Sequence, residues 1–231
     1  MSEPTLWPWL ALAGLGALHG INPGMGWLFA VALGLQEGRA GAVWRALPPL
    51  ALGHALAIAL AVAVAVAAGG FLPIGPLRWG VAGVLLAFGI YRLARHHHPR
   101  YGGMRVRGRQ LASWSFLMAT GHGAGLMILP IVLASPLLGP GMAGGTTTST
   151  LGHAAAGGHA GHTALAGLPP GVASGAAVAL VHTAGYLLVA AALAWLVFAH
   201  WGVRILRTAW INLDLIWAGA LIATAIATPF I

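Results

Sequence analysis

The chain has 231 residues, of which 59% are hydrophobic and only 6% are charged. Soluble domains carry roughly 25% charged residues, so this composition excludes an ordinary soluble protein and indicates an integral membrane protein. All eleven basic residues are arginine and the chain has no cysteine, which excludes disulfides, thiol relays, iron–sulfur clusters and thiolate metal sites.

Six apolar segments follow one another, and most reach the roughly 20 residues that a membrane-spanning helix needs. They are 6–34, 47–68, 76–91, 111–133, 172–199 and 208–228. Their hydrophobic residues run continuously rather than alternating, so we expect an all-α polytopic protein with six transmembrane helices in one membrane domain, 1–231. No basic residue precedes the first segment, so we expect a retained span rather than a cleavable signal peptide.

The first segment contains helix-breaking and polar residues in its middle, "HGINPGM". Glycine and proline interrupt helices, so we expect this span to unwind near the bilayer midplane and to free backbone groups there. The helix-breaking candidates are Gly20, Pro23 and Gly24, and the candidate ligands are His19, Asn22 and Met25.

The fourth segment contains a similar stretch, "TGHGAGLMILP". Its helix-breaking candidates are Gly121, Gly123, Gly125 and Pro130, and its candidate ligands are His122 and Met127. We expect His19 and His122 to face each other across one cavity.

Two further landmarks recur in the same order. His54 in the second segment matches His182 in the fifth, and Arg78 before the third matches Arg207 before the sixth. Repeat one then covers 6–95 and repeat two 110–231, with a His- and Gly-rich outer loop inserted at about 139–170. Three spans per half give the halves opposite orientations, so we expect a 3+3 inverted-topology repeat with broken helices 1 and 4, a plan typical of transporters.

The arginines indicate the orientation. Ten of the eleven fall in loops on one side of the six spans, and only Arg78 lies on the other. The positive-inside rule places the ten in the cytoplasm and both termini outside, which predicts a multi-pass protein of a bacterial inner membrane. The net charge of +8 then reports topology and not binding to nucleic acid.

The six-span plan and the two broken segments resemble the LysE-type exporter superfamily, including its nickel/cobalt NicO-type and CcdA-type members. NicO-type members carry a histidine followed by a Pro-acidic-His cluster in the first span. Here His19 and Pro23 fit that pattern, while Gly24 and Met25 stand at the acidic and histidine positions. CcdA-type members use a cysteine in each broken span, which this chain lacks. The resemblance implies a transporter scaffold.

Ionisable groups inside spans are functional candidates, because a charge at the bilayer centre costs ~2.5–3.5 kcal/mol on insertion scales. We expect His19, His122 and His182 at mid-depth and His54 nearer the cytoplasmic side. Imidazole binds Zn, Cu, Ni and Co, and methionine sulfur favours Cu(I). Neutral ligands favour a monovalent cation, whereas free amides at broken helices would instead hold an anionic or zwitterionic solute.

Two sets of candidates lie outside this group. Asp214, seven residues after Arg207, is a candidate for proton coupling or for a structural ion pair. The outer loop holds three histidines that could collect metal ions, His153, His159 and His162.

These features predict a secondary transporter and not an enzyme, with a transition-metal ion as substrate and no certain cofactor. No Walker A motif is present, so the energy would come from a gradient or a partner. The alternatives are a transporter of a small anionic or zwitterionic solute, a membrane electron carrier binding haem b, and an intramembrane zinc enzyme. Whether the chain works alone, as a homodimer or with a partner subunit stays open.

Overall fold

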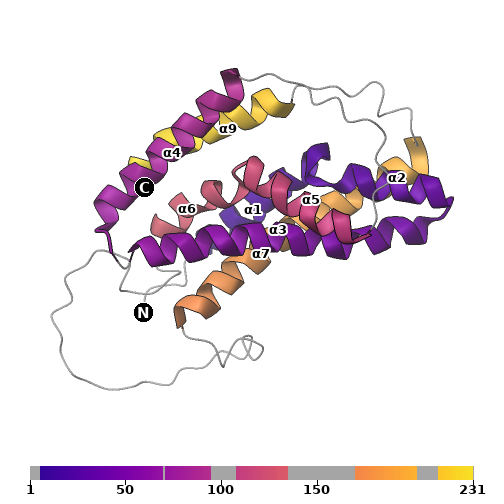
Figure 1. Ribbon diagram of the computed structural model, residues 1–231, viewed down its shortest axis with the longest axis horizontal. Coiled ribbons are helices and arrows are strands. Elements are labelled where there is room, and N and C mark those ends of the chain that lie inside the picture. The colour runs from indigo at the N-terminus through magenta and orange to yellow at the C-terminus, as the bar shows by residue number, and fades with distance from the viewer. Residues whose placement is uncertain (1–5, 70, 95–107, 135–169, 202–212, 231) are drawn as a thin grey trace.

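The computed structural model describes residues 6–69, 71–94, 108–134, 170–201 and 213–230 (Figure 1). Within these ranges the chain is helical apart from short turns, and it contains no strand. The all-α architecture predicted from the continuous apolar segments is therefore confirmed for the described residues.

The helical elements have the following bounds. In chain order they are α1 (Trp7–Ile21), η1 (Pro23–Met25), α2 (Trp27–Glu37), α3 (Ala40–Gly69), α4 (Ile74–Ala94), α5 (Gly108–Gly121), α6 (Ala124–Ala134), α7 (Pro170–Leu196), the π-helical turn η3 (Val197–Trp201), α9 (Leu213–Ala227) and η4 (Thr228–Phe230). Three of them, α3, α4 and α7, are long and apolar enough to cross a membrane. The bent pair α5 and α6 gives a fourth candidate span.

Helix α3 begins earlier than the apolar segment 47–68 predicted. It spans 30 residues and continues through Pro48 and Pro49, which corresponds to about 45 Å of helix. The hydrocarbon core of a bilayer is only ~30 Å thick. An apolar run therefore marks the part of a long helix that can lie within the membrane, and it does not mark the ends of the helix. The first turns of α3, with Trp44 and Arg45, extend beyond the apolar run.

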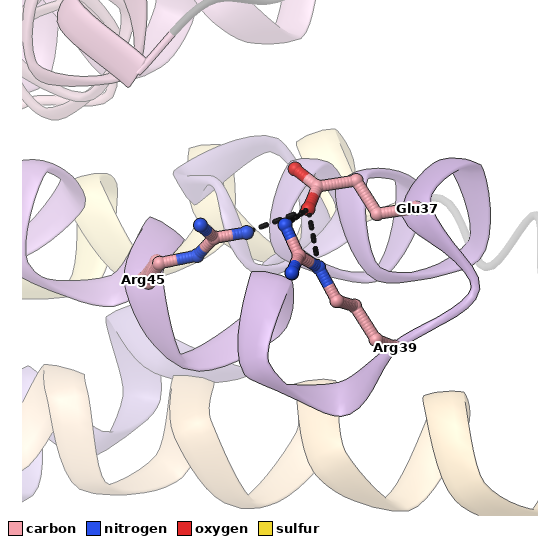
Figure 2. Close-up of polar contacts among 3 residues, drawn as sticks. All are labelled: Glu37, Arg39 and Arg45. Carbon is pink, nitrogen blue, oxygen red and sulfur yellow. Dashed lines mark hydrogen bonds and ion pairs between the residues drawn. The ribbon is translucent and has the colours of Figure 1, made fainter.

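The turn between α2 and α3 is held by charged groups. Gly38 ends α2 with a φ of 63°, a left-handed conformation that glycine adopts without strain. The Glu37 carboxylate accepts hydrogen bonds from Arg39 Nε at 2.8 Å and from a terminal nitrogen of Arg45 at 2.6 Å (Figure 2). One carboxylate thereby connects the end of α2 to the first turns of α3.

The helices pack in three main pairs. α1 runs along α7, α5 along α3, and α4 along α9. Figure 1 shows α4 and α9 side by side at one edge of a bundle formed by the other helices. A hydrophobic cluster that includes Leu85, Met127 and Leu221 joins this pair to α6.

The α1–α7 and α3–α5 pairs approach closely through glycine. A Cβ atom at Gly16 or at Gly185 would overlap a backbone carbonyl of the facing helix, that of His182 or that of Ala13. Gly53 on α3 is likewise in contact with the carbonyl of Ala112 on α5. These glycines let the helix backbones touch, which brings their polar side chains into the middle of the bundle.

The bundle has an apolar outer surface and a mainly apolar interior that contains a few buried polar side chains. On α3, large side chains at intervals of four residues are more than half exposed, namely Leu52, Leu56, Leu60 and Val64. The inward face of the same helix carries His54, which is fully buried. Such a distribution suits a helix that faces lipid on one side and buried polar side chains on the other.

Candidate functional site

The helical run of the first apolar segment breaks at Asn22–Gly26, as the sequence predicts. The Asn22 side chain accepts a hydrogen bond from the amide of Gly24 at 2.9 Å and caps the short η1 turn. The amides of Met25 and Gly26 donate to the carbonyls of Asn22 and Pro23. The expectation that this break frees its backbone groups is therefore wrong for these three amides, because the turn bonds them internally.

The second break lies between α5 and α6, which meet at an angle of 60°. Gly123 adopts a φ of 72°, and its amide donates to the carbonyl of Thr120. Pro130 and Gly125 were also expected to break the span, but both lie inside α6. Gly125 instead packs against Ala61 of α3, so its small size serves helix contact.

The two breaks lie against each other. A Cβ atom built on Gly24 in η1 would lie 3.9 Å from Cε1 of His122, in the turn between α5 and α6. His122 is buried, and its Nδ1 lies 2.8 Å from the carbonyl of Met118. Polar residues of the two helix breaks are therefore neighbours in the bundle.

Three histidines from three helices meet next to the first break. The ring centroids of His19 on α1 and His182 on α7 are 5.1 Å apart. His54 on α3 lies 5.8 Å from His19 and 5.4 Å from His182. His54, expected nearer the cytoplasmic side than the other two, has its ring in the same cluster. We call these three side chains the histidine cluster.

Hydrogen bonds fix the tautomer of two of these rings. His19 Nδ1 lies 2.7 Å from the carbonyl of Leu15, and His182 Nδ1 lies 3.1 Å from the carbonyl of Leu12. A carbonyl only accepts, so Nδ1 carries the hydrogen in each ring. In the neutral ring the other nitrogen, Nε2, then presents a lone pair.

The remaining nitrogens of the histidine cluster are unsatisfied. Nε2 of His19, Nε2 of His182 and both ring nitrogens of His54 are buried and have no hydrogen-bond partner among the described residues. Leaving a buried polar group unpaired costs ~1–3 kcal/mol, so these nitrogens need a partner, such as water or a ligand, that the described residues do not supply.

Two aromatic side chains that the sequence reasoning missed form walls of the histidine cluster. The Trp217 ring on α9 lies 4.5 Å from that of His19. The Tyr186 ring on α7 stacks on His54 at 4.1 Å and 13°. Tyr186 follows His182 by four residues, a spacing that places two side chains on one helix face, so the sequence did contain this signal.

The other candidate ligands lie elsewhere or outside the described residues. Met25 and Met127 are buried in two different hydrophobic clusters. Asp214 belongs to α9, three residues before Trp217, but its side chain lies outside the described residues. The loop histidines also lie outside them, namely His153, His159 and His162.

In the part of the chain that the structure describes, no group of three or more His, Asp or Glu side chains is positioned to hold a metal ion. A three-ligand site would therefore require a ring to turn. His54 is the ring of the cluster whose nitrogens no described residue holds.

Comparison of the chain with models of protein families, with curated proteins and with solved structures gives no match. The site is therefore interpreted from its own chemistry.

Proposed function

We propose that the protein is a secondary transporter that moves a transition-metal ion, Cu, Ni, Co or Zn, through the histidine cluster. The observation that carries this proposal is the meeting of three buried imidazoles from α1, α3 and α7, with ring centroids 5.1–5.8 Å apart and unpaired nitrogens. Imidazole is a ligand of each of these metals. Buried ionisable groups in membrane helices commonly mark ion pathways.

The proposed architecture is six spans arranged as a 3+3 inverted repeat. α1 with α2 and α5 with α6 would be the two broken spans, and α9 the sixth span. Two matched features support the repeat. First, α1 packs on α7 as α5 packs on α3. In addition, His19 and His122 both bond through Nδ1 to the carbonyl four residues earlier. Paired interruptions of this kind mark substrate sites in transporters.

The tautomers favour a cation over an anionic or zwitterionic solute. His19 and His182 present lone pairs, which a metal cation binds and an anion does not. The amides of the first break, which could have held an anion, already donate within the turn. The substrate class is therefore proposed as a cation.

The proposed setting is a bacterial inner membrane with both termini outside, which follows from the arginine distribution. No acidic side chain is described at the histidine cluster, and Glu37 is exposed and bonded to Arg39 and Arg45. Neutral imidazoles accept a metal without a fixed counter-charge, so charge balance would come from coupled ion movement. Asp214 remains our candidate for proton coupling.

The test is metal binding and flux with the purified full-length protein. Cu(I), Ni(II), Co(II) and Zn(II) are each offered to the protein in detergent and then to proteoliposomes. His19→Gln and His182→Gln are expected to lower affinity for the transported metal by about tenfold or more, since disturbing even the surroundings of a metal ligand costs 10–100-fold.

His200→Gln is the matched control. His200 is exposed, and its Nδ1 lies 3.3 Å from the carbonyl four residues earlier, so the ring has the same local contact without the cluster. Binding and flux that are absent for all four metals, or unchanged in both cluster variants, would refute the proposal. A Soret band in the purified protein would indicate the haem-binding alternative instead.

A further inference from the structure

Tyr186 connects the histidine cluster to the first helix break. Its hydroxyl donates a hydrogen bond of 2.7 Å to the carbonyl of Met25, the last residue of η1. Its ring stacks on His54 at 4.1 Å. The side chain is fully buried, so both contacts are made inside the bundle.

The Met25 carbonyl is a sensitive point of the backbone. It immediately precedes Gly26, whose φ of 122° is accessible to glycine and rarely to other residues. A bond to this carbonyl therefore holds the peptide that turns the chain from η1 into α2. Gly20, near the end of α1, packs against the backbone of Tyr186, so α7 supports both sides of the break.

The other end of this connection is a ring that can turn. Both nitrogens of His54 lack a hydrogen-bond partner among the described residues, so ring contacts orient it, and the stacking on Tyr186 at 4.1 Å is closer than the contacts with His19 and His182. Turning His54 toward a substrate at His19 and His182 would remove that stacking. When the ring of His54 turns away, the ring of Tyr186 loses its stacking contact with it.

We propose that Tyr186 is a positioning residue that couples the orientation of His54 to the conformation of the first helix break. With His54 stacked, the hydroxyl of Tyr186 holds η1 in the turn seen here. With His54 turned, this hold weakens and the break can rearrange. As a description of transport this rests on the proposed function, but the coupling itself is a property of the protein without substrate.

The test uses the fact that the chain has no cysteine. Gly24→Cys places one thiol in η1, where a Cβ atom would lie 3.9 Å from Cε1 of His122 and in tight contact, at 3.2 Å, with Oδ1 of Asn22, a side chain that must shift by a few tenths of an ångström in all four backgrounds alike. The rate of labelling by a water-soluble maleimide then reports how often the break opens. It is measured on the full chain in liposomes, without metal, in four backgrounds: unchanged, Tyr186→Phe, His54→Ala and the double variant.

Tyr186→Phe keeps the ring and removes only the hydroxyl. A buried hydrogen bond contributes a net 0.5–1.5 kcal/mol, so labelling is expected to rise about 2- to 10-fold. His54→Ala is expected to raise it as well, and the double variant no further than Tyr186→Phe alone, because residues acting through one contact are not additive. Thr228→Val is the matched control, since it removes another buried 2.7 Å hydroxyl–carbonyl bond away from the break.

Labelling of Tyr186→Phe at the unchanged rate, or effects of the two variants that multiply, would overturn the coupling. These outcomes are separate from those of the metal experiment. Metal flux together with labelling effects that multiply would support the proposed transporter and reject the coupling. Non-additive labelling effects without any metal binding would support the coupling and reject the proposed transporter.

Discussion

The close contact of α1 with α7 makes Gly16→Ala a severe change. The added methyl carbon would overlap the carbonyl oxygen of His182 and lie 3.0 Å from the amide nitrogen of Tyr186. A carbon atom normally stays about 3.3–3.6 Å from a carbonyl oxygen. Both neighbours are helix backbone, which cannot turn away as a side chain can. The two helices must therefore separate.

The magnitude follows from three contributions. Overpacking costs ~1–3 kcal/mol, and backbone neighbours place this site at the upper end. Separation also lengthens the bond from His182 Nδ1 to the carbonyl of Leu12, which contributes about 1 kcal/mol. Alanine returns up to ~1 kcal/mol through its better helix propensity. The net destabilisation is about 2–3 kcal/mol, or a drop in Tm of about 5–10 °C for a chain of this size.

The assay compares thermal unfolding of purified Gly16→Ala with that of Gly14→Ala. Gly14 lies on the same helix, and a Cβ atom there has no neighbour within 4 Å among the described residues. Gly14→Ala is expected to unfold at or slightly above the temperature of the unchanged protein. Equal midpoints for the two variants would show that α1 and α7 do not touch at Gly16, and the position of His182 would have to be revised.

Three further outcomes are expected. Asn22→Ala removes the cap of η1 and should lower the free energy of unfolding by about 1 kcal/mol. Asn22→Asp keeps a hydrogen-bond acceptor and should lower it by less. Equal losses in the two variants would contradict the capping role. Leu85→Ala empties a fully buried position between α4 and α9 and should cost ~2–5 kcal/mol, against little change for exposed Leu86→Ala. The hydrogen bond from Arg39, with the charge of Arg45, lowers the pKa of Glu37 below its ordinary 4.5. The stabilisation of the fold by the Glu37 carboxylate is therefore complete above pH 4.5 and is lost as the pH falls through the lower pKa of the folded state. The Tm of Glu37→Gln should differ from that of the unchanged protein at neutral pH, and the two should converge in acid.

Local sequence signals predicted the helices and both breaks. Pro-Gly and Gly-rich stretches act on the backbone within a few residues, so "INPGM" and "GHG" marked the interruptions at Asn22–Gly26 and around Gly123. Not every such residue breaks a helix, as Pro130 inside α6 and Pro48 inside α3 show. Pro130 is buried and Pro48 is exposed, so burial alone does not decide whether a proline interrupts a helix.

The depth of His54 could not be read from hydropathy. Counted from the apolar onset at residue 47 it lies only seven residues into its span, whereas α3 begins at Ala40 and places it fourteen residues along the helix. Apolarity reports contact with lipid and not the start of a helix. The helices that carry or directly precede the other three histidines begin close to their apolar onsets, so counting from the onset gives nearly their true place along the helix.

The contacts between helices were the least predictable part. Trp217 appears in the sequence as an ordinary aromatic residue of an apolar segment, and only tertiary packing brings it to His19. The spacing of Tyr186 from His182 places both on one face of α7 but does not show that the Tyr186 ring meets His54. The two methionines were matched by their spacing from His19 and His122, yet they lie in separate hydrophobic clusters. Spacing along one helix does not fix which neighbour a side chain meets.

The hydrogen bond from His182 to Leu12 links two members of the histidine cluster, His19 and His182, to α1 and leaves His54 on a separate helix. His19 belongs to α1, and His182, although carried by α7, is tied by its Nδ1 to the α1 backbone. His54 belongs to α3. If α1 and α7 moved together relative to α3, they would carry two imidazoles and leave the third behind, so the separations of 5.8 Å and 5.4 Å from His54 would change and that between His19 and His182 would not.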